Sequence, residues 1–316
     1  MGQGRWVWAL AVAVLVAGLV VPSHAAKVYS VVTGPVGGPM YAISGAWAEV
    51  INKGSGGYQL TNQVGGGSVL TMKVLANGEA DFAMVGNDVA MYGFRGTEAF
   101  AGKPVAHARA VAALYLESFH VVVKAGSPMR ELADLKGKRV AVGPPASGTQ
   151  LASERILALV GLKDFRKLEL GFNESAEYLR DGNADAAVYQ TGIPYGPIVD
   201  ISVMQAVDLL GLPDSAIQQI GNAYPFYVPV TIPKSTYRGL TGDVKSVAVK
   251  MLLLASAKVP DEDVYTVTKA LFANLDRLKV SHKMGETITR EKALEGVTIP
   301  LHPGAEKFYR EAGILK

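Results

Sequence analysis

Hydrophobic positions in the first third of the chain follow two spacings, one typical of strands and one typical of helices. The β-branched run at 28–33 predicts a strand, and apolar residues at helical spacing predict a helix over 40–51. Polar and apolar residues alternate at 58–64, a second helical pattern follows at 68–75, and 81–85 is again strand-like. This βαβαβ order is typical of a parallel sheet flanked by helices.

A second unit of the same kind begins near the middle of the chain. Its predicted strands lie at 139–142, 167–170 and 184–189, and its predicted helices lie at 147–160 and 175–180. The two units share an order of elements but no detectable sequence repeat. The pattern therefore predicts two α/β lobes.

The segments outside these units are strongly apolar. Residues 109–124 are interpreted as two strands, or as one strand that crosses between the lobes, and 224–232 as the segment that crosses back. Beyond it, 247–256 predicts a strand, and an apolar stripe over 264–278 predicts a helix. Three acidic residues at 261–263 stand at the front of that helix, where they complement its dipole.

Two crossings predict a hinge between the lobes. Lobe 1 would be discontinuous, formed by 26–117 together with 226–316, and lobe 2 would consist of 118–225. In open α/β sheets, ligands bind outside the carboxyl ends of the strands, and the polar, Gly-rich turns of both units fall at those ends. We therefore expect one ligand cleft between the lobes.

Residues 1–25 have the features of a cleavable signal peptide. Arg5 supplies a positive charge, 6–21 is an unbroken run of apolar or small residues, and Ser23 and Ala25 occupy positions −3 and −1 of a cleavage site. The alternative is a single membrane anchor, because the run is near the length that spans a bilayer, about 17–25 residues. The small residues that directly follow the run favour cleavage, so we expect a periplasmic protein.

The composition narrows the classes of function. Charged residues make up 19% of the chain and the net charge is +3, without a basic run interleaved with aromatics, so nucleic-acid binding is not expected. The absence of cysteine excludes disulfides, thiolate catalysis and a lipid anchor on cysteine. The sequence also lacks G-x-S-x-G, H-E-x-x-H and P-loop motifs, and its histidines are scattered singly. We expect no enzyme, no metal and no cofactor.

Short motifs occur in a fixed order over nearly the whole mature chain. They are Thr33-Gly-Pro-Val-Gly-Gly-Pro-Met-Tyr41, Gly66-Gly-Ser-Val69, Asn77-Gly-Glu-Ala-Asp-Phe82, Asp88-Val-Ala90, Leu114-Tyr115 with Glu117, Leu135-Lys-Gly-Lys-Arg-Val140, Gly143 with Ser147-Gly-Thr149, Ala223-Tyr-Pro-Phe-Tyr227 and Ile299-Pro-Leu-His-Pro-Gly-Ala-Glu306. Together they resemble the TAXI family of TRAP-transporter solute receptors. One departure is Tyr189-Gln-Thr-Gly-Ile-Pro194, where Gln190 and Thr191 add polarity at positions that are usually small or apolar in the family.

The resemblance implies a periplasmic binding protein-like fold of type II, in which two α/β lobes joined by crossing strands enclose a ligand cleft. It also implies a receptor that serves a sodium-coupled secondary transporter without an ATPase. Family ligands are typically glutamate, glutamine, 2-oxoglutarate and similar carboxylates. We therefore expect a monomer that delivers a small organic anion or amino acid to TRAP membrane permease subunits. The alternative is a periplasmic sensor, in which the same fold presents its solute to a sensor kinase.

The segment from Ser147 to Gln150 opens a predicted helix directly after a strand. Free backbone N–H groups and the helix dipole make such a position an anion site, although the Ser-x-x-Gln spacing is also that of a plain helix cap. Gly34 and Gly67 allow a ligand to approach the backbone closely in turns of the first unit. With the family resemblance, the predicted ligand-binding residues are Thr33, Gly34, Tyr41, Gly67, Ser68, Asn87, Asp88, Tyr115, Ser147, Gly148, Thr149, Gln190, Thr191 and Gly192.

Charged side chains play a smaller part in this prediction. Asp88 is interpreted as a ligand contact or as the cap of the next helix, and Glu117 as a hinge or rim residue. No arginine stands out as a bidentate clamp for a carboxylate, and Arg95, Arg109 and Lys124 are left as basic residues that could reach the cleft. We therefore expect backbone N–H groups and hydroxyls to bind the ligand's negative charge.

Overall fold

The computed structural model describes residues 26–316, so the predicted signal peptide lies outside the described residues. The strands are β1 (Lys27–Val32), β2 (Tyr58–Gln63), β3 (Phe82–Gly86), β4 (Ala108–Lys124), β5 (Arg139–Ala141), β6 (Arg166–Leu168), β7 (Ala186–Thr191), β8 (Val207–Leu209), β9 (Val228–Ile232) and β10 (Val244–Ser256). The α-helices are α1 (Pro39–Gly54), α2 (Ser68–Asn77), α3 (Asn87–Arg95), α4 (Gly148–Leu159), α5 (Phe172–Asp181), α6 (Gly196–Met204), α7 (Asp214–Ala223), α8 (Asp261–Ala273), α9 (Leu275–Ser281) and α10 (Pro303–Glu311). Among the residues described, no helix has the length and apolar character needed to cross a bilayer.

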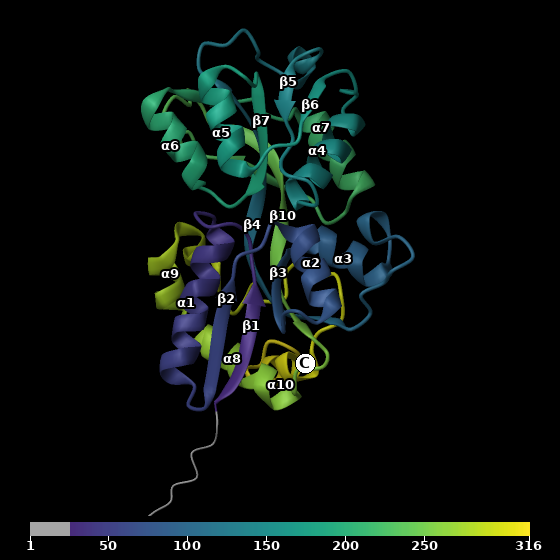
Figure 1. Cartoon of the computed structure of the whole chain (residues 1–316), viewed down its shortest axis with the longest axis vertical. Coiled ribbons are helices and arrows are strands. Elements are labelled where there is room, and N and C mark those ends of the chain that lie inside the picture. Colours follow the sequence, from purple (N-terminus) through teal and green to yellow (C-terminus); the bar gives the residue numbers. More distant parts are fainter. Residues whose placement is uncertain (1–25) are drawn as a thin grey trace, which may run out of the picture.

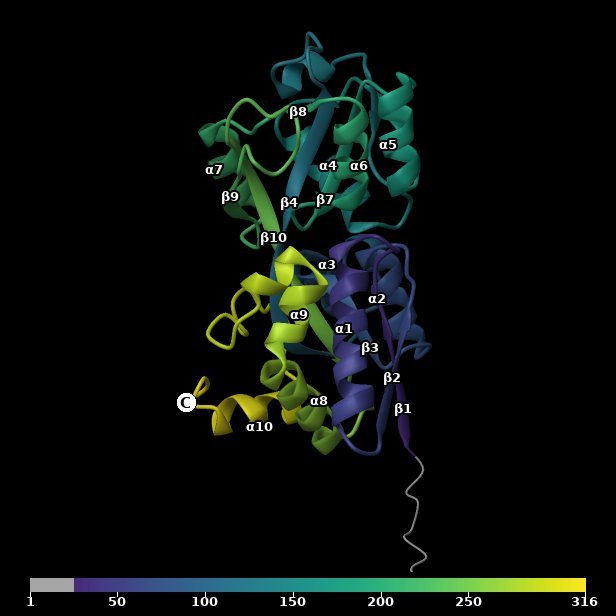
Figure 2. The same cartoon turned by 90° about the vertical axis from the view of Figure 1, so that its left-hand side faces the viewer.

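The strands of residues 26–316 form one sheet with the order β2-β1-β3-β10-β4-β7-β5-β6. In addition, β8 pairs with β4 and β9 pairs with β10. Strands β1, β2 and β3 pair in parallel, as do β5, β6 and β7. Figures 1 and 2 show two halves stacked along the long axis. We call the half built on β1–β3, with α1–α3 and α8–α10, the lower lobe, and the half built on β5–β7, with α4–α7, the upper lobe. The predicted two-lobed α/β fold is thus confirmed.

Two long antiparallel strands, β4 and β10, join the lobes through the middle of the sheet (Figure 1). Of the two interpretations of 109–124, the structure therefore has the single crossing strand. The return crossing expected at 224–232 was placed wrongly, because β9 in that segment pairs alongside β10, and β10 itself returns to the lower lobe. The burial of the two segments explains this outcome: β10 is buried along most of its length, as a central strand requires, whereas β9 is largely exposed. The boundaries of lobes 1 and 2 stay a prediction.

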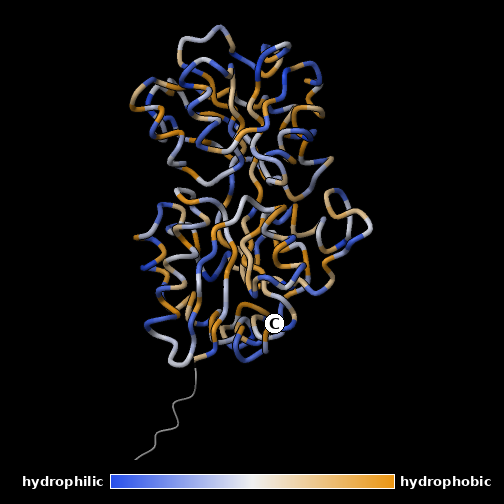
Figure 3. The backbone as a smooth tube through the Cα atoms, viewed as in Figure 1, coloured by the Kyte–Doolittle hydropathy of each residue, from blue (hydrophilic) through white to orange (hydrophobic). Residues whose placement is uncertain are grey.

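Hydrophobic residues recur along the inner strands of both lobes, and the outer loops are mainly hydrophilic (Figure 3). In the lower lobe, the fully buried Trp47 of α1 packs edge-to-face on Phe82 of β3, with ring centroids 5.4 Å apart. In the upper lobe, Tyr189 of β7 packs against Tyr195 and Ile198 near the start of α6. Each lobe thus buries its own aromatic residues and can hold its share of the site rigidly.

The apolar stripe over 264–278 forms two helices rather than the one that was predicted. Asn274 ends α8, and its side-chain amide donates to the carbonyl of Ala270 at 2.9 Å. An Asn side chain competes with the backbone for such hydrogen bonds, which favours a helix end at this position. The acidic front of α8 is confirmed, and Asp263 within it is buried and accepts hydrogen bonds from Lys27 Nζ, Tyr29 OH and Tyr58 OH at 2.6, 2.5 and 2.7 Å.

Candidate ligand-binding site

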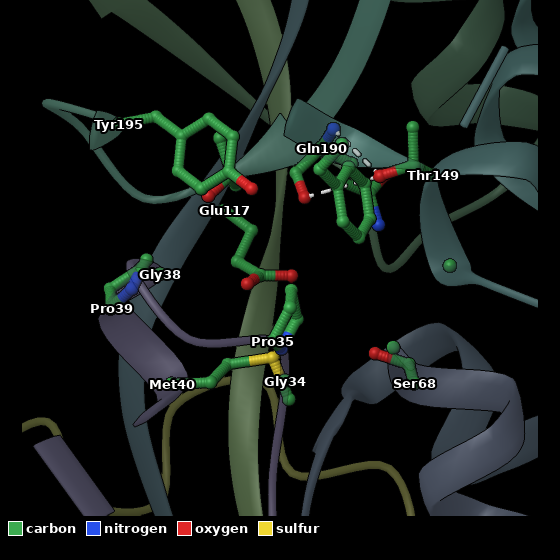
Figure 4. Close-up of a pocket in the computed structure, with 14 residues that line it drawn as sticks. Gly34, Pro35, Gly38, Pro39, Met40, Ser68, Glu117, Thr149, Gln190 and Tyr195 are labelled. Atoms are coloured by element: carbon green, nitrogen blue, oxygen red, sulfur yellow. Dashed lines mark hydrogen bonds between the residues drawn. The ribbon is translucent and has the colours of Figure 1, made fainter. Parts of the chain in front are cut away.

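A cavity lies between the two lobes, beside the crossing strands (Figure 4). Its empty space, counted together with adjoining open solvent, is about 430 Å³. Its lining comes from the lower lobe, from β4 and from the upper lobe. The lining residues are Gly34, Pro35, Gly38, Pro39, Met40, Gly67, Ser68, Glu117, Gly148, Thr149, Phe172, Gln190, Thr191 and Tyr195.

Four helices begin at this cavity. The first residues of α1, α2, α4 and α5 are Pro39, Ser68, Gly148 and Phe172, and all four line it. The N-terminus of a helix carries unpaired N–H groups and about half a positive charge from the aligned peptide dipoles. These helix starts therefore place partial positive charge of the backbone at the cavity wall.

Helices α2 and α4 meet almost start to start across the boundary between the lobes. Gly67, which precedes α2, has a φ of 118°, and a Cβ atom added to it would lie 3.0 Å from Cβ of Ser147. The backbone N–H of Leu70 in α2 donates to the carbonyl of Ala146, just before α4, at 3.0 Å. Glycine is required at position 67 both for its backbone conformation and for this close approach.

The first turns of α2 and α4 leave amides unpaired. Ser147 caps α4 by accepting a hydrogen bond from the N–H of Gln150 at 3.0 Å. The Gln150 side chain accepts from Ala146 N at 3.0 Å, so only the Ser147 half of the predicted capping box forms. Neither Ser68 N nor Gly148 N has an acceptor within residues 26–316. These two N–H groups are available to an anion.

The upper wall of the cavity is fixed by hydrogen bonds within the upper lobe. The N–H of Gln190 donates to Thr149 Oγ1 at 3.1 Å, which ties the end of β7 to the start of α4. The side-chain oxygen of Gln190 accepts from Tyr227 OH at 3.2 Å. With its oxygen engaged, the Gln190 amide has its NH₂ group left to offer as a donor.

Glu117 is the acidic residue of the lining, and Figure 4 shows its side chain directed into the space between the lobes. It is 5% exposed. Burial raises the pKa of Glu117 well above its usual range, and the nearby charge of Asp88 adds to the shift. Asp88 is itself fully buried without a hydrogen-bond partner among the described residues, and burial raises its pKa to about 6.

Seven of the predicted ligand-binding residues come together in the cavity wall. They are Gly34, Gly67, Ser68, Gly148, Thr149, Gln190 and Thr191. Their contact with a ligand remains a prediction. Three of the basic residues considered from sequence lie elsewhere: Arg95 borders a separate hollow, Arg109 donates to Ala106 and Ala108 carbonyls, and Lys124 lies beside Gly182.

The other seven predicted residues lie outside the cavity lining. Four have neighbours within the protein that account for their positions. Thr33 Oγ1 donates to the Gln63 carbonyl, and Ser147 Oγ donates to the Pro144 carbonyl. Asn87 bonds to Gly296 O and Lys250 N, and Gly192 lies against Met284 and Pro39. The remaining three are Tyr41, Asp88 and Tyr115.

Of these, Tyr115 is fully buried, and its hydroxyl, which has no partner among the described residues, borders a different hollow. Asp88 stands in the first turn of α3, which is the capping alternative, but its side chain makes no cap hydrogen bond. Tyr41 offers its carbonyl to Ser44 Oγ and Asn62 Nδ2 within the lower lobe. All three therefore stand near the cleft without forming its wall.

Glu117 was missed as a wall residue, since it was interpreted as a hinge or rim position. The signal was present in the sequence, because Glu117 is the one acidic residue in the apolar run 110–123. An ionisable residue inside a buried strand is unfavourable without a function or a partner. Phe172 and Tyr195 carried no comparable signal, since only the fold brings these aromatic residues to the cavity.

Arg155 of α4 reaches from the upper lobe onto the lower lobe. Its guanidinium carbon lies 4.0 Å from the ring centre of Tyr92 in α3, and its Nη2 lies 3.2 Å from Glu98 Oε2. Because Glu98 is about half exposed, that ion pair contributes little, about 0–1 kcal/mol, whereas a desolvated cation–π contact contributes about 2 kcal/mol. The lobes are therefore in direct contact on the α3–α4 side of the cavity.

The fold and the site together define a class: two α/β lobes, two crossing strands and a cavity between helix N-termini are the architecture of a periplasmic binding protein. Over residues 31–313 the chain matches the NMT1-like family and therefore belongs to it. This is a family of periplasmic solute-binding proteins. The narrower resemblance to TAXI receptors is taken up below as a proposal.

Solved structures of binding proteins share the fold at low sequence identity. The periplasmic binding protein BugD matches with a TM-score of 0.55 at 13% identity, covering 92% of this chain and 98% of that chain. The alkanesulfonate-binding protein SsuA from Xanthomonas axonopodis pv. citri, bound to MOPS, matches with a TM-score of 0.52 at 16% identity, covering 90% of this chain and 84% of that chain. A putative L-cystine ABC transporter from Listeria monocytogenes matches with a TM-score of 0.52 at 17% identity, covering 83% of this chain and 98% of that chain.

Proposed function

We propose that the protein is the extracytoplasmic receptor of a TAXI-type TRAP transporter, which captures a small organic anion such as glutamate, 2-oxoglutarate or a related carboxylate. It delivers that solute to the membrane permease. The ordered motifs support the TAXI assignment, and membership of the NMT1-like family supports solute binding. Its place of work is the periplasm, reached through the signal peptide of residues 1–25.

The observation that carries the anion proposal is the meeting of α2 and α4 at their N-termini. Each helix start bears about half a positive charge, so an anion beside both starts offsets their mutual repulsion. Unpaired N–H groups at Ser68 and Gly148 line this place. A carboxylate that accepts from both amides would neutralise the two dipoles and join one lobe to the other.

This arrangement gives a mechanism for capture. A carboxylate binds the helix starts of one lobe while the cleft is open, and the starts of the other lobe then close over it about β4 and β10. Closure brings Arg155 onto Tyr92 and Ala146 onto Leu70, contacts that the structure contains. Ligand binding thus favours the closed form by adding contacts that exist only when the lobes meet.

Thermal-shift screening of the purified protein tests the proposal. We expect amino acids and mono- or dicarboxylates to raise the melting temperature, because a ligand at 100 times its Kd stabilises the fold by about 2.7 kcal/mol. Methyl esters of the same compounds serve as controls that keep the carbon skeleton and remove the negative charge of the carboxyl groups. A melting temperature that rises equally with ester and acid, or with neither, would contradict an anion site.

A further inference from the structure

Glu117 occupies an unusual position in the candidate site. It lies on β4, the strand that crosses between the lobes, and is 5% exposed with its side chain directed into the cavity (Figure 4). Its carboxylate has no hydrogen bond and no ion pair with any of residues 26–316. The protein therefore holds an acceptor group inside its cleft to which no donor of the described residues is bonded.

The surroundings of Glu117 offer no positive side chain. The residues lining the cavity include no Arg, Lys or His. The ionisable groups whose charges act on Glu117, or on which it acts, are Asp88 on α3, Tyr115 on its own strand and Tyr195 before α6. None of them carries a positive charge, and neither tyrosine hydroxyl donates a hydrogen bond to Glu117 within residues 26–316.

A nearly buried carboxyl without a protein partner keeps only the hydration that the cavity allows, which is unfavourable for a charged group. A ligand that carries a protonated amine would supply the missing donor and the missing positive charge together. The helix starts at Ser68 and Gly148 supply the opposite charge on the same cavity wall. The cavity is therefore complementary to a zwitterion.

We propose that Glu117 recognises a protonated amine on the ligand, so that the site selects α-amino acids over 2-oxo acids and over dicarboxylates that lack an amine. The inference rests on the proposed function and deepens it, since it assigns the ligand's carboxylate to the starts of α2 and α4 and its ammonium group to Glu117. Figure 4 shows Glu117 between Ser68 and Met40 of the lower lobe and Thr149, Gln190 and Tyr195 of the upper lobe.

Binding of an ammonium group also moves a proton. Because burial raises the pKa of Glu117, the empty site holds this carboxyl in its neutral form over a wider range of pH than usual. The incoming ammonium group stabilises the carboxylate form, so Glu117 loses its proton to the buffer as the ligand binds. Asp88, whose pKa is about 6, is nearby but does not line the cavity.

Calorimetric titration with matched pairs of ligands tests the inference. L-Glutamate with 2-oxoglutarate and L-alanine with pyruvate differ only in amine against carbonyl. We expect each amino acid to bind at least tenfold more tightly than its partner, with proton release visible as a different heat in phosphate and Tris buffers. Glu117→Gln should weaken amino-acid binding at least tenfold and abolish the proton release, and Glu286→Gln, which removes an exposed charge, should change neither.

The outcomes separate this inference from the proposed function. Suppose that oxo acids or dicarboxylates bind as tightly as amino acids, and that Glu117→Gln leaves their affinity intact. Glu117 would then donate a hydrogen bond to a carboxylate, which would contradict the inference and leave the proposed receptor function unaffected. If no small anion or zwitterion binds, the proposed function fails as well. Because the proton release is measured on the unaltered protein, the test does not depend on how the variant folds.

Discussion

Substituting Gly67 by alanine should separate the stability of the lower lobe from the closure of the cleft. The backbone at Gly67 has φ 118° and ψ 172°, a conformation that is nearly restricted to glycine. An alanine there costs about 1–3 kcal/mol whether the cleft is open or closed. The added Cβ would also lie 3.0 Å from Cβ and 3.3 Å from Cα of Ser147, and this second cost exists only when α4 lies against α2.

The second cost determines ligand affinity. Overpacking of this kind costs about 1–3 kcal/mol, and each 1.4 kcal/mol is a factor of ten in a binding constant. We therefore expect Gly67→Ala to bind the ligand roughly 5- to 100-fold more weakly than the unaltered protein. The loss should appear mainly as faster dissociation, since the clash arises after the ligand has entered the open cleft.

Gly78→Ala is the matched control. Gly78 ends α2 with a φ of 75°, so alanine is strained there too, but an added Cβ would meet nothing within 4 Å. Both variants should unfold at lower denaturant concentration, measured by circular dichroism. Only Gly67→Ala should lose affinity, measured by titration calorimetry. Equal affinities of the two variants would refute the idea that α2 and α4 approach each other when the ligand is bound.

Two further predictions concern contacts at the cleft, and a third concerns the start of α8 in the lower lobe. Arg155→Met should weaken binding about 30-fold through loss of the cation–π contact with Tyr92, taken as about 2 kcal/mol, with faster ligand release in stopped-flow fluorescence; an unchanged release rate would contradict a role in closure. Ser147→Ala combined with Thr149→Ala should weaken binding at least tenfold by calorimetry, and unchanged affinity would remove the start of α4 from the site. Asp263→Asn should lower the free energy of unfolding by about 2–3 kcal/mol, measured by urea denaturation, without altering affinity.

Asp263 also predicts a dependence of stability on pH. Burial raises the pKa of Asp263, but hydrogen bonds from Lys27, Tyr29 and Tyr58 outweigh it and hold the pKa below its usual range. A carboxyl with a lowered folded-state pKa stabilises the fold above its unfolded pKa of about 3.9 and loses that contribution as the pH falls further. The difference in stability between the protein and Asp263→Asn should thus shrink below about pH 4.

Hydrophobic periodicity was sufficient to predict the two parallel α/β units, because their strands are apolar runs separated by glycine turns. The elements it missed have weaker patterns. Helix α3 was indicated only by the interpretation of Asp88 as a cap, because it lies directly after β3 with no intervening turn, and β8 has three residues, too few for a period to appear. The segment 224–232 was predicted to cross between the lobes because it is apolar. Exposed edge strands such as β9 are apolar too, so only the pairing of β9 with β10 shows which strand crosses.

The candidate site was predictable where it depends on local backbone chemistry. The glycine turns and helix starts at Gly67, Ser68, Gly148 and Thr149 were all predicted from sequence, and they meet in one cavity. The packing of segments that lie far apart in the chain was not predictable from sequence. This packing keeps Asn87 out of the cavity wall and brings Tyr195 into it. The sequence singled out Glu117 without placing it in the cavity wall, since a lone acid on a crossing strand is compatible with a hinge, a rim or a ligand contact.

The central claim is that a carboxylate is bound between the starts of α2 and α4. A crystal structure of the protein with the solute that stabilises it most in the thermal-shift screen would test this directly. We predict a carboxylate oxygen within hydrogen-bond distance of Ser68 N and another of Gly148 N, with the lobes closed around it. A solute found instead in the hollow bordered by Asn87, Arg95 and Phe226, with both amides left unpaired, would contradict the account.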